Sequence, residues 1–180
     1  MKNFLLRISI IFLIIFFQLN FLNLIFLENR LVNLSILAVI SWVIASGFEK
    51  IWIWIVLLGF LNDIFLAQKI GPNILFFISF AYLISFVSRR FIIERRFSGF
   101  LLVIFFILMG NVWGSFFDFL FSGADISAEI VSYMKNYFIN WKDFIGTNIY
   151  AGICFYFIYN LINRVEKYIA RNESRLKMSL

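Results

Sequence analysis

Asp63 is the side chain of this sequence whose type and position most restrict the chemistry open to the chain. It is the one carboxylate between Gly59 and Tyr82, a stretch in which two membrane helices, expected at 51–67 and 72–87, meet at a Gly-Pro turn. A charge costs about 2.5 to 3.5 kcal/mol at the centre of a bilayer and less near its surface, so it requires a partner. Gly59 precedes Asp63 by four residues and Ala67 follows it by four, which places all three on one helix face. Because small residues allow backbones to approach closely, we expect this face to contact another helix.

Gly71 and Pro72 are predicted to form the turn that follows Asp63. Gly71 tolerates unusual backbone angles, and Pro72, the only proline, suits the first turn of a helix. A plainer interpretation of Asp63, that it only caps a span near the membrane surface, stays open beside the contact hypothesis.

The bulk composition predicts a polytopic membrane protein of the all-α class. The chain has 180 residues, of which 63% are hydrophobic and 14% charged, and its mean hydropathy is +0.93. Soluble domains carry about 25% charged residues and could not bury so much apolar surface. We expect a single integral membrane domain with six transmembrane helices in one bundle and a basic tail from Arg164, with Glu49 and Lys50 ending the second helix. The expected spans are 4–27, 31–48, 51–67, 72–87, 99–121 and 146–163, with an extracytoplasmic loop at 122–145 that holds an interfacial helix.

The distribution of basic residues predicts the orientation of this bundle. Twelve lysines and arginines fall on the side that holds both termini and four on the other side, so both termini are expected in the cytoplasm. The plainer role of the densest cluster is to fix this topology, and its other role is contact with anionic lipid or an acidic cytoplasmic partner. This cytoplasmic basic loop contains Arg89, Arg90, Arg95 and Arg96.

Few residues here could support catalysis or metal binding. The chain has no histidine, and its single cysteine, Cys154, lacks a base to activate it. Intramembrane aspartyl proteolysis would need a second aspartate, and Asp118 stands in no supporting motif. We therefore expect no enzyme activity, no cofactor and no metal. The formal charge of +6 is explained better by membrane topology than by nucleic-acid binding, because the basic residues lie between apolar spans and in the tail.

Two other features indicate contact between helices. Gly110 and Gly114 form a G-x-x-x-G pattern in the fifth span, which is common at membrane helix interfaces and also common by chance. Gln18 is polar for a lipid-facing position, so we expect that half of the first helix to be covered by protein.

The segment from Leu57 to Phe65, LLGFLNDIF, together with the turn and the helix ending in Ala-Tyr-Leu, resembles the bacterial rod shape-determining protein MreD family. The matching residues are Gly59, Asp63, Gly71 and Tyr82. The resemblance covers about residues 50 to 90, and elsewhere it is limited to size, six short spans and a basic tail. Asn62 and Asn73 depart from the family pattern, which often has an apolar residue and Leu-Gly at these places.

This resemblance implies a non-catalytic scaffold of the cell-elongation complex in the bacterial inner membrane, supporting cell shape and peptidoglycan synthesis. It implies MreC as a partner and, through MreC, the MreB filament, RodA and a penicillin-binding transpeptidase, besides membrane lipid. The fold that it implies is similar to that of the substrate-binding subunits of energy-coupling-factor transporters.

That second similarity leaves an alternative function open, the binding of a vitamin-type small molecule. Trp113 and Trp141 could stack on such a ligand, with Asp63 or Asn111 orienting it. The plainer role of both tryptophans is to anchor the chain at the membrane surface. A vitamin that copurified with the protein would favour transport over a scaffold.

Overall fold

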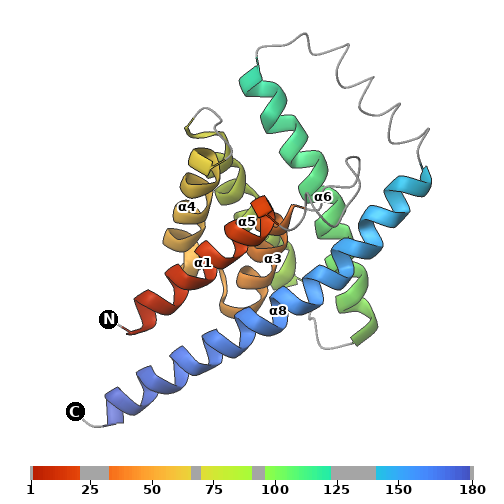
Figure 1. Cartoon of the computed structure of the whole chain (residues 1–180). Coiled ribbons are helices and arrows are strands. Elements are labelled where there is room, and N and C mark those ends of the chain that lie inside the picture. The colour runs from red at the N-terminus through yellow and green to blue at the C-terminus, as the bar shows by residue number, and fades with distance from the viewer. Residues whose placement is uncertain (1, 21–32, 66–69, 91–95, 123–140, 179–180) are drawn as a thin grey trace.

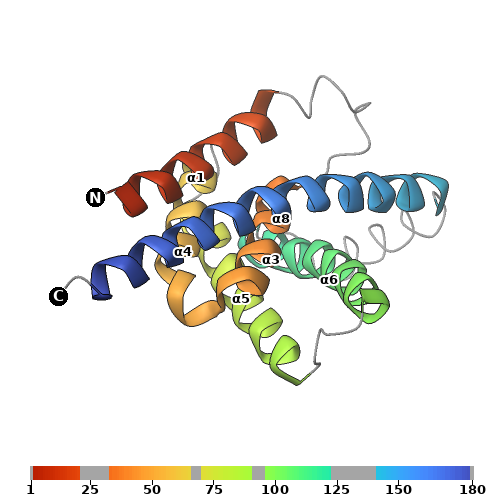
Figure 2. The same cartoon turned by 90° about the horizontal axis from the view of Figure 1, so that it is seen from below.

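The chain folds as a bundle of α-helices in the computed structural model, which describes residues 2–20, 33–65, 70–90, 96–122 and 141–178 (Figure 1). The described ranges contain helices and no strand, so the all-α prediction is confirmed. The two termini lie at the same end of the bundle, and α1 runs antiparallel to α8 (Figures 1 and 2). The helices are α1 (Lys2–Asn20), α3 (Leu34–Ser46), α4 (Phe48–Phe65), α5 (Pro72–Arg90), α6 (Arg96–Ser122) and α8 (Trp141–Met178).

Helix α3 lies at the centre of this bundle and contacts each of the other five helices. Its residues from Leu34 to Val43 are buried without a break, which is typical of a helix that is apolar all round and enclosed by neighbours. With 13 residues it is about 20 Å long at 1.5 Å per residue. It is therefore shorter than the 31–48 span expected from the sequence and has no face left for lipid along its buried stretch.

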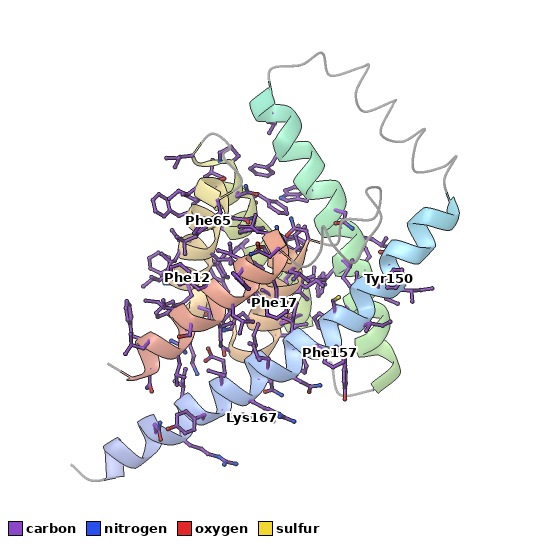
Figure 3. All side chains as sticks on the ribbon, viewed as in Figure 1. Phe12, Phe17, Phe65, Tyr150, Phe157 and Lys167 are labelled. Atoms are coloured by element: carbon purple, nitrogen blue, oxygen red, sulfur yellow. The ribbon has the colours of Figure 1, made fainter. Side chains whose placement is uncertain are left out.

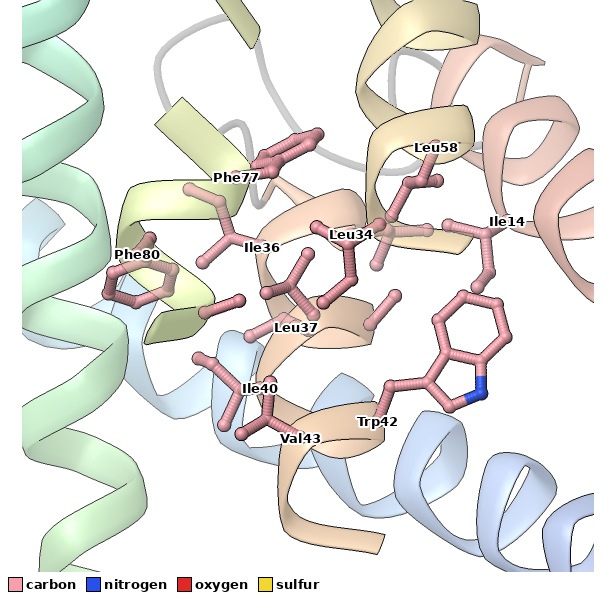
Figure 4. Close-up of a cluster of buried hydrophobic side chains, with 14 of the residues drawn as sticks. Ile14, Leu34, Ile36, Leu37, Ile40, Trp42, Val43, Leu58, Phe77 and Phe80 are labelled. Carbon is pink, nitrogen blue, oxygen red and sulfur yellow. The ribbon is translucent and has the colours of Figure 1, made fainter. Parts of the chain in front are cut away.

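The core is built around α3 by large side chains from the surrounding helices. Figure 4 shows Trp42 and Leu37 of α3 close to Ile14 of α1, Leu58 of α4 and the rings of α5. Trp42 is fully buried, and burying an aromatic side chain of this size removes about 150 to 250 Å² from solvent. The central helix is thus held mainly by apolar contact on all sides.

The chain turns sharply between α3 and α4 at Gly47, and not at the charged pair that follows. Gly47 has φ of 78°, which glycine adopts without strain, and its N–H donates to the carbonyl oxygen of Val43 at 3.0 Å. Glu49 lies in the first turn of α4, where a carboxylate interacts favourably with the helix dipole. The expectation that Glu49 and Lys50 end the second helix is wrong, because they begin the third.

Helix α8 is much longer than the last expected span. It has 38 residues, or about 57 Å at 1.5 Å per residue, and continues through the tail to Met178. Arg164 is therefore inside a helix, whereas the sequence predicted it as the start of a tail beyond the span. The carboxyl-terminal part of α8 extends beyond the ends of α3 and α5 (Figures 1 and 2).

Among the described residues, one helix is long and apolar enough by itself to cross a membrane, at Asn3–Asn20. Three shorter apolar helices accompany it, at Leu34–Ser46, Pro72–Ser88 and Leu102–Asn111. The loop expected at 122–145 falls mostly on residues 123–140, which lie outside the described part of the chain.

Candidate functional site

Asp63 lies in the last turn of α4, with its carboxylate against the first turn of α5. Its Oδ2 accepts from the backbone N–H of Gly71 at 2.8 Å, and its Oδ1 accepts from the N–H of Asn73 at 3.1 Å. These N–H groups belong to the helix start, where donors have no partner inside the helix and the dipole favours a negative charge. Asp63 is fully buried, so the two bonds replace water around its carboxylate. The capping role considered from the sequence is therefore present, and the capped helix is α5 rather than the one that carries Asp63.

Gly59 brings the backbones of α4 and α5 together one turn before this cap. A Cβ atom added at Gly59 would lie 2.8 Å from Cα of Ile74 and 3.0 Å from the carbonyl oxygen of Asn73. Any larger residue would push the helices apart, since both neighbours are backbone atoms. Gly59 and Asp63 thus face the same helix, and Ala67 lies outside the described residues.

The connection into α5 has the backbone conformation that its sequence predicts. Gly71 has φ of 126°, a region that side chains with a Cβ rarely adopt, and Pro72 is the first residue of α5. Gly71 also donates to Asp63, so the turn and the cap form one unit. We call Gly59, Asp63 and Gly71, with the first turn of α5 that they hold, the capped hairpin. Tyr82 lies further along α5, is 62% exposed, and packs edge-on against Phe48 at 5.9 Å between ring centroids.

Asn62 occupies an unusual position beside the capped hairpin. It continues the row of buried side chains on α4 formed by Ile51, Ile55 and Leu58, and is itself 2% exposed. Within the described part of the chain, its Nδ2 has no hydrogen-bond partner. A buried amide donor without a partner costs about 1 to 3 kcal/mol.

A second polar centre joins the two helices that carry the termini. Arg7 of α1 donates to Glu166 of α8 through two bonds, Nε to Oε1 at 2.9 Å and Nη2 to Oε2 at 2.7 Å. Trp42 Nε1 donates to the same Oε1 at 3.1 Å, and the guanidinium lies 5.6 Å from the ring centroid of Trp54. The carboxylate therefore accepts three hydrogen bonds, and the cation contacts an aromatic face as well as its counter-ion. The pair is largely buried, with 16% of the Arg7 side chain and 8% of the Glu166 side chain exposed.

This ion pair was not expected from the sequence. Arg7 is one of the twelve lysines and arginines that predict the orientation, and Glu166 falls within the basic tail expected from Arg164. A signal was present, because Glu166 lies four residues after Ile162 and three before Ile169, on one helix face with two buried apolar residues. A carboxylate on such a face needs a buried partner.

Gly110 of the G-x-x-x-G pattern lies in a close contact, and Gly114 does not. A Cβ atom at Gly110 would lie 2.8 Å from Cγ2 of Ile36 and 2.9 Å from Cζ of Phe80. At Gly114 the nearest atom is Cζ of Phe76, at an ordinary 3.4 Å. Helix α6 therefore approaches α3 and α5 most closely at the first of the two glycines.

Other polar positions predicted to contact protein or ligand are placed as follows. Gln18 of α1 accepts from the Oγ of Ser35 at 2.7 Å and from its backbone N–H at 3.1 Å, so this half of α1 is tied to α3. Trp113 of α6 donates to Ser79 of α5 at 3.2 Å and so links two helices. Arg95 and the side chains of Trp141, Arg89, Arg90 and Arg96 lie outside what the structure describes.

The described residues contain no group of three or more histidine, cysteine, aspartate or glutamate side chains that could hold a metal ion. Cys154 is a half-buried free thiol on α8. The two polar centres join helices: Asp63 joins α4 to α5, and Arg7 with Glu166 joins α1 to α8.

Comparison with known proteins gave no match: no family model, no curated protein and no solved structure is similar to this chain at a significant level.

Proposed function

We propose that the protein is a non-catalytic, multi-pass scaffold of the bacterial inner membrane, acting in the cell-elongation complex with MreC as its direct partner. MreB, RodA and a penicillin-binding transpeptidase would join it through MreC. Both termini would lie in the cytoplasm, and the chain would support cell shape and peptidoglycan synthesis by holding partners together.

The observation that carries this proposal is the capped hairpin. The resemblance to the MreD family rests on Gly59, Asp63, Gly71 and Tyr82, and the first three of these act together in space. Gly59 meets the backbone of α5, and Asp63 accepts from the N–H of Gly71. Three motif residues that meet in one structural unit support the resemblance more strongly than the same three residue types would if they lay apart in the structure.

Embedding in a membrane is supported by the large apolar side chains on the outside of the bundle. On α1, six of them are more than 40% exposed, and the other outer helices add more (Figure 3). A soluble monomer rarely presents apolar patches of this extent. On α1 these side chains are Phe4, Leu5, Phe12, Leu13, Phe16 and Phe17.

A scaffold also agrees with the kind of polar contact that the described residues make. The hydrogen bonds of Asp63 and Glu166 end on backbone groups or side chains of neighbouring helices. A rigid bundle with exposed apolar sides can present fixed surfaces to partner helices, and Tyr82 is exposed on the helix that the capped hairpin positions.

The test is copurification of MreC with the tagged full-length chain from bacterial membranes, combined with cell shape after replacement of the chromosomal gene. Asp63→Asn is the informative variant, because its amide can accept one of the two N–H bonds but turns a second donor toward the other N–H. We expect reduced MreC recovery and rounded cells. Gly152→Ala is the matched control, because a Cβ atom there would meet nothing within 4 Å.

Full MreC recovery and normal rods with Asp63→Asn would contradict the assignment of the capped hairpin. A parent chain that recovers no MreC, and instead binds a vitamin tightly after purification, would overturn the scaffold in favour of the transporter-type function.

A further inference from the structure

The outer face of α8 changes its chemistry along its length. Its exposed large side chains between residues 149 and 161 recur at spacings of three and four residues, so they share one face. They are Ile149, Tyr150, Ile153, Tyr156, Phe157 and Leu161. Phe157, at 68%, is among the most exposed apolar side chains of the described chain (Figure 3).

The same face becomes basic within one turn after Leu161. Arg164, Lys167 and Arg171 are exposed, and Tyr168, beside them, is 52% exposed. We call these four residues the basic face of α8. The acidic residue nearest to them in the described helix, Glu166, is buried on the opposite side and bonded to Arg7. The positive charge of Arg164 and Lys167 is therefore not neutralised by it.

The Arg7–Glu166 pair joins α1 to α8 at the height where the outer face of α8 becomes basic. On α1, Arg7 immediately precedes the long apolar run that starts at Ile8, and on α8, Glu166 lies between Arg164 and Lys167. The bonds of 2.7 and 2.9 Å hold Arg7 beside this part of α8. The exposed apolar surface of α8 thus ends beside Arg7, at the end of the bundle where the termini lie (Figure 1). On α1 it continues past Arg7 to Leu5 and Phe4, which are 58% and 57% exposed.

We propose that the basic face of α8 binds the phosphate headgroups of anionic phospholipids in the leaflet nearest the termini. This inference rests on the membrane embedding of the proposed function. A lipid fits the whole outer face of α8, since its acyl chains match Phe157 and Leu161 and its phosphate matches Arg164 and Lys167. Tyr168 is a residue type that favours the headgroup level. A soluble acidic protein would match the basic end alone.

The experiment titrates the detergent-solubilised full-length chain separately with phosphatidylglycerol and with phosphatidylcholine, and measures each dissociation constant by native mass spectrometry. We expect phosphatidylglycerol to bind more tightly, with a preference that falls as salt is added. Each basic residue near an anionic surface contributes about fivefold, so Arg164→Gln with Lys167→Gln should reduce the preference by up to about 25-fold.

Two control pairs separate the basic face from general charge. Arg164→Lys with Lys167→Arg keeps both charges and should keep the preference. Lys135→Gln with Lys142→Gln removes two charges from the segment expected on the other side and should also keep it. The proposal would be overturned if Lys135→Gln with Lys142→Gln reduced the preference as much as Arg164→Gln with Lys167→Gln does. It would also be overturned if Arg164→Gln with Lys167→Gln caused no loss.

The outcomes also separate this proposal from the function on which it rests. If Arg164→Gln with Lys167→Gln loses the lipid preference and still recovers MreC as the parent does, the lipid site is supported independently of the scaffold function. A parent chain with no lipid preference, whose Arg164 and Lys167 instead retain a soluble acidic protein, would replace the lipid by a protein partner. A chain washed from membranes at alkaline pH would overturn both the embedding and the lipid site.

Discussion

Replacing Gly59 by alanine should destabilise the bundle, because the new methyl group would meet the backbone of α5. Its distance of 2.8 Å from Cα of Ile74 must open to at least 3.4 Å to be an ordinary contact, so α5 must move by at least 0.6 Å. A shift of this size also strains the bonds from Asp63 to Gly71 and Asn73, which are 2.8 and 3.1 Å long. The variant thus changes the packing and the cap together.

The expected net effect of Gly59→Ala is a loss of up to about 2 kcal/mol in the free energy of unfolding. Overpacking of a well-packed contact costs about 1 to 3 kcal/mol. Alanine is favoured over glycine in a helix by about 1 kcal/mol, which offsets part of this cost. At Gly152 the added methyl group meets nothing within 4 Å, so Gly152→Ala keeps the helix gain without the clash.

The measurement is equilibrium unfolding of both purified variants in mixed micelles, followed by far-ultraviolet circular dichroism as the fraction of denaturing detergent increases. We expect Gly152→Ala to be at least as stable as the parent and Gly59→Ala to unfold at lower detergent fraction. If Gly59→Ala proves as stable as Gly152→Ala, the close approach of α4 and α5 at this position is refuted.

Two further substitutions test the other buried polar groups by the same unfolding assay. Glu166→Gln should lower stability by about 2 kcal/mol, because it removes the charge that receives Arg7 while leaving one acceptor oxygen; the exposed neighbour Lys167→Gln serves as the control, and equal effects from both would contradict a specific ion pair. Asn62→Leu should raise stability by about 1 kcal/mol, because it removes a buried Nδ2 donor that has no partner among the described residues; a less stable variant would show that the amide has a bonding role.

The local features of the capped hairpin were predictable from the sequence because they depend on neighbours in the chain. Gly59 and Asp63 share a helix face by their spacing of four, and Pro72 marks the start of a helix by its fixed φ and missing N–H. The group that Asp63 binds was not predictable, because residue spacing shows which side of the helix Asp63 lies on but does not identify the atoms that pack against that side.

The features that were not predicted from the sequence depend on contacts between residues far apart in the chain, or on the lack of residues that end a helix. Arg7 and Glu166 are 159 residues apart, and no pattern in a single sequence pairs two charges at that separation. The central position of α3 follows from the packing of all its neighbours rather than from its own composition. The extension of α8 did leave a trace, since neither glycine nor proline occurs between Gly152 and Met178 to stop the helix.

The Arg7–Glu166 pair also constrains the order in which the molecule can be completed during synthesis. Arg7 is synthesised 159 residues before its counter-ion. In the membrane-embedded protein proposed above, α1 would therefore enter the bilayer with an unmatched cation near its leading end. In that arrangement the charge would stay at the water boundary until α8 arrives, and this would hold α1 in one orientation while the intervening helices insert. Final closure of the bundle is consequently a late event that joins the earliest helix to the latest one described.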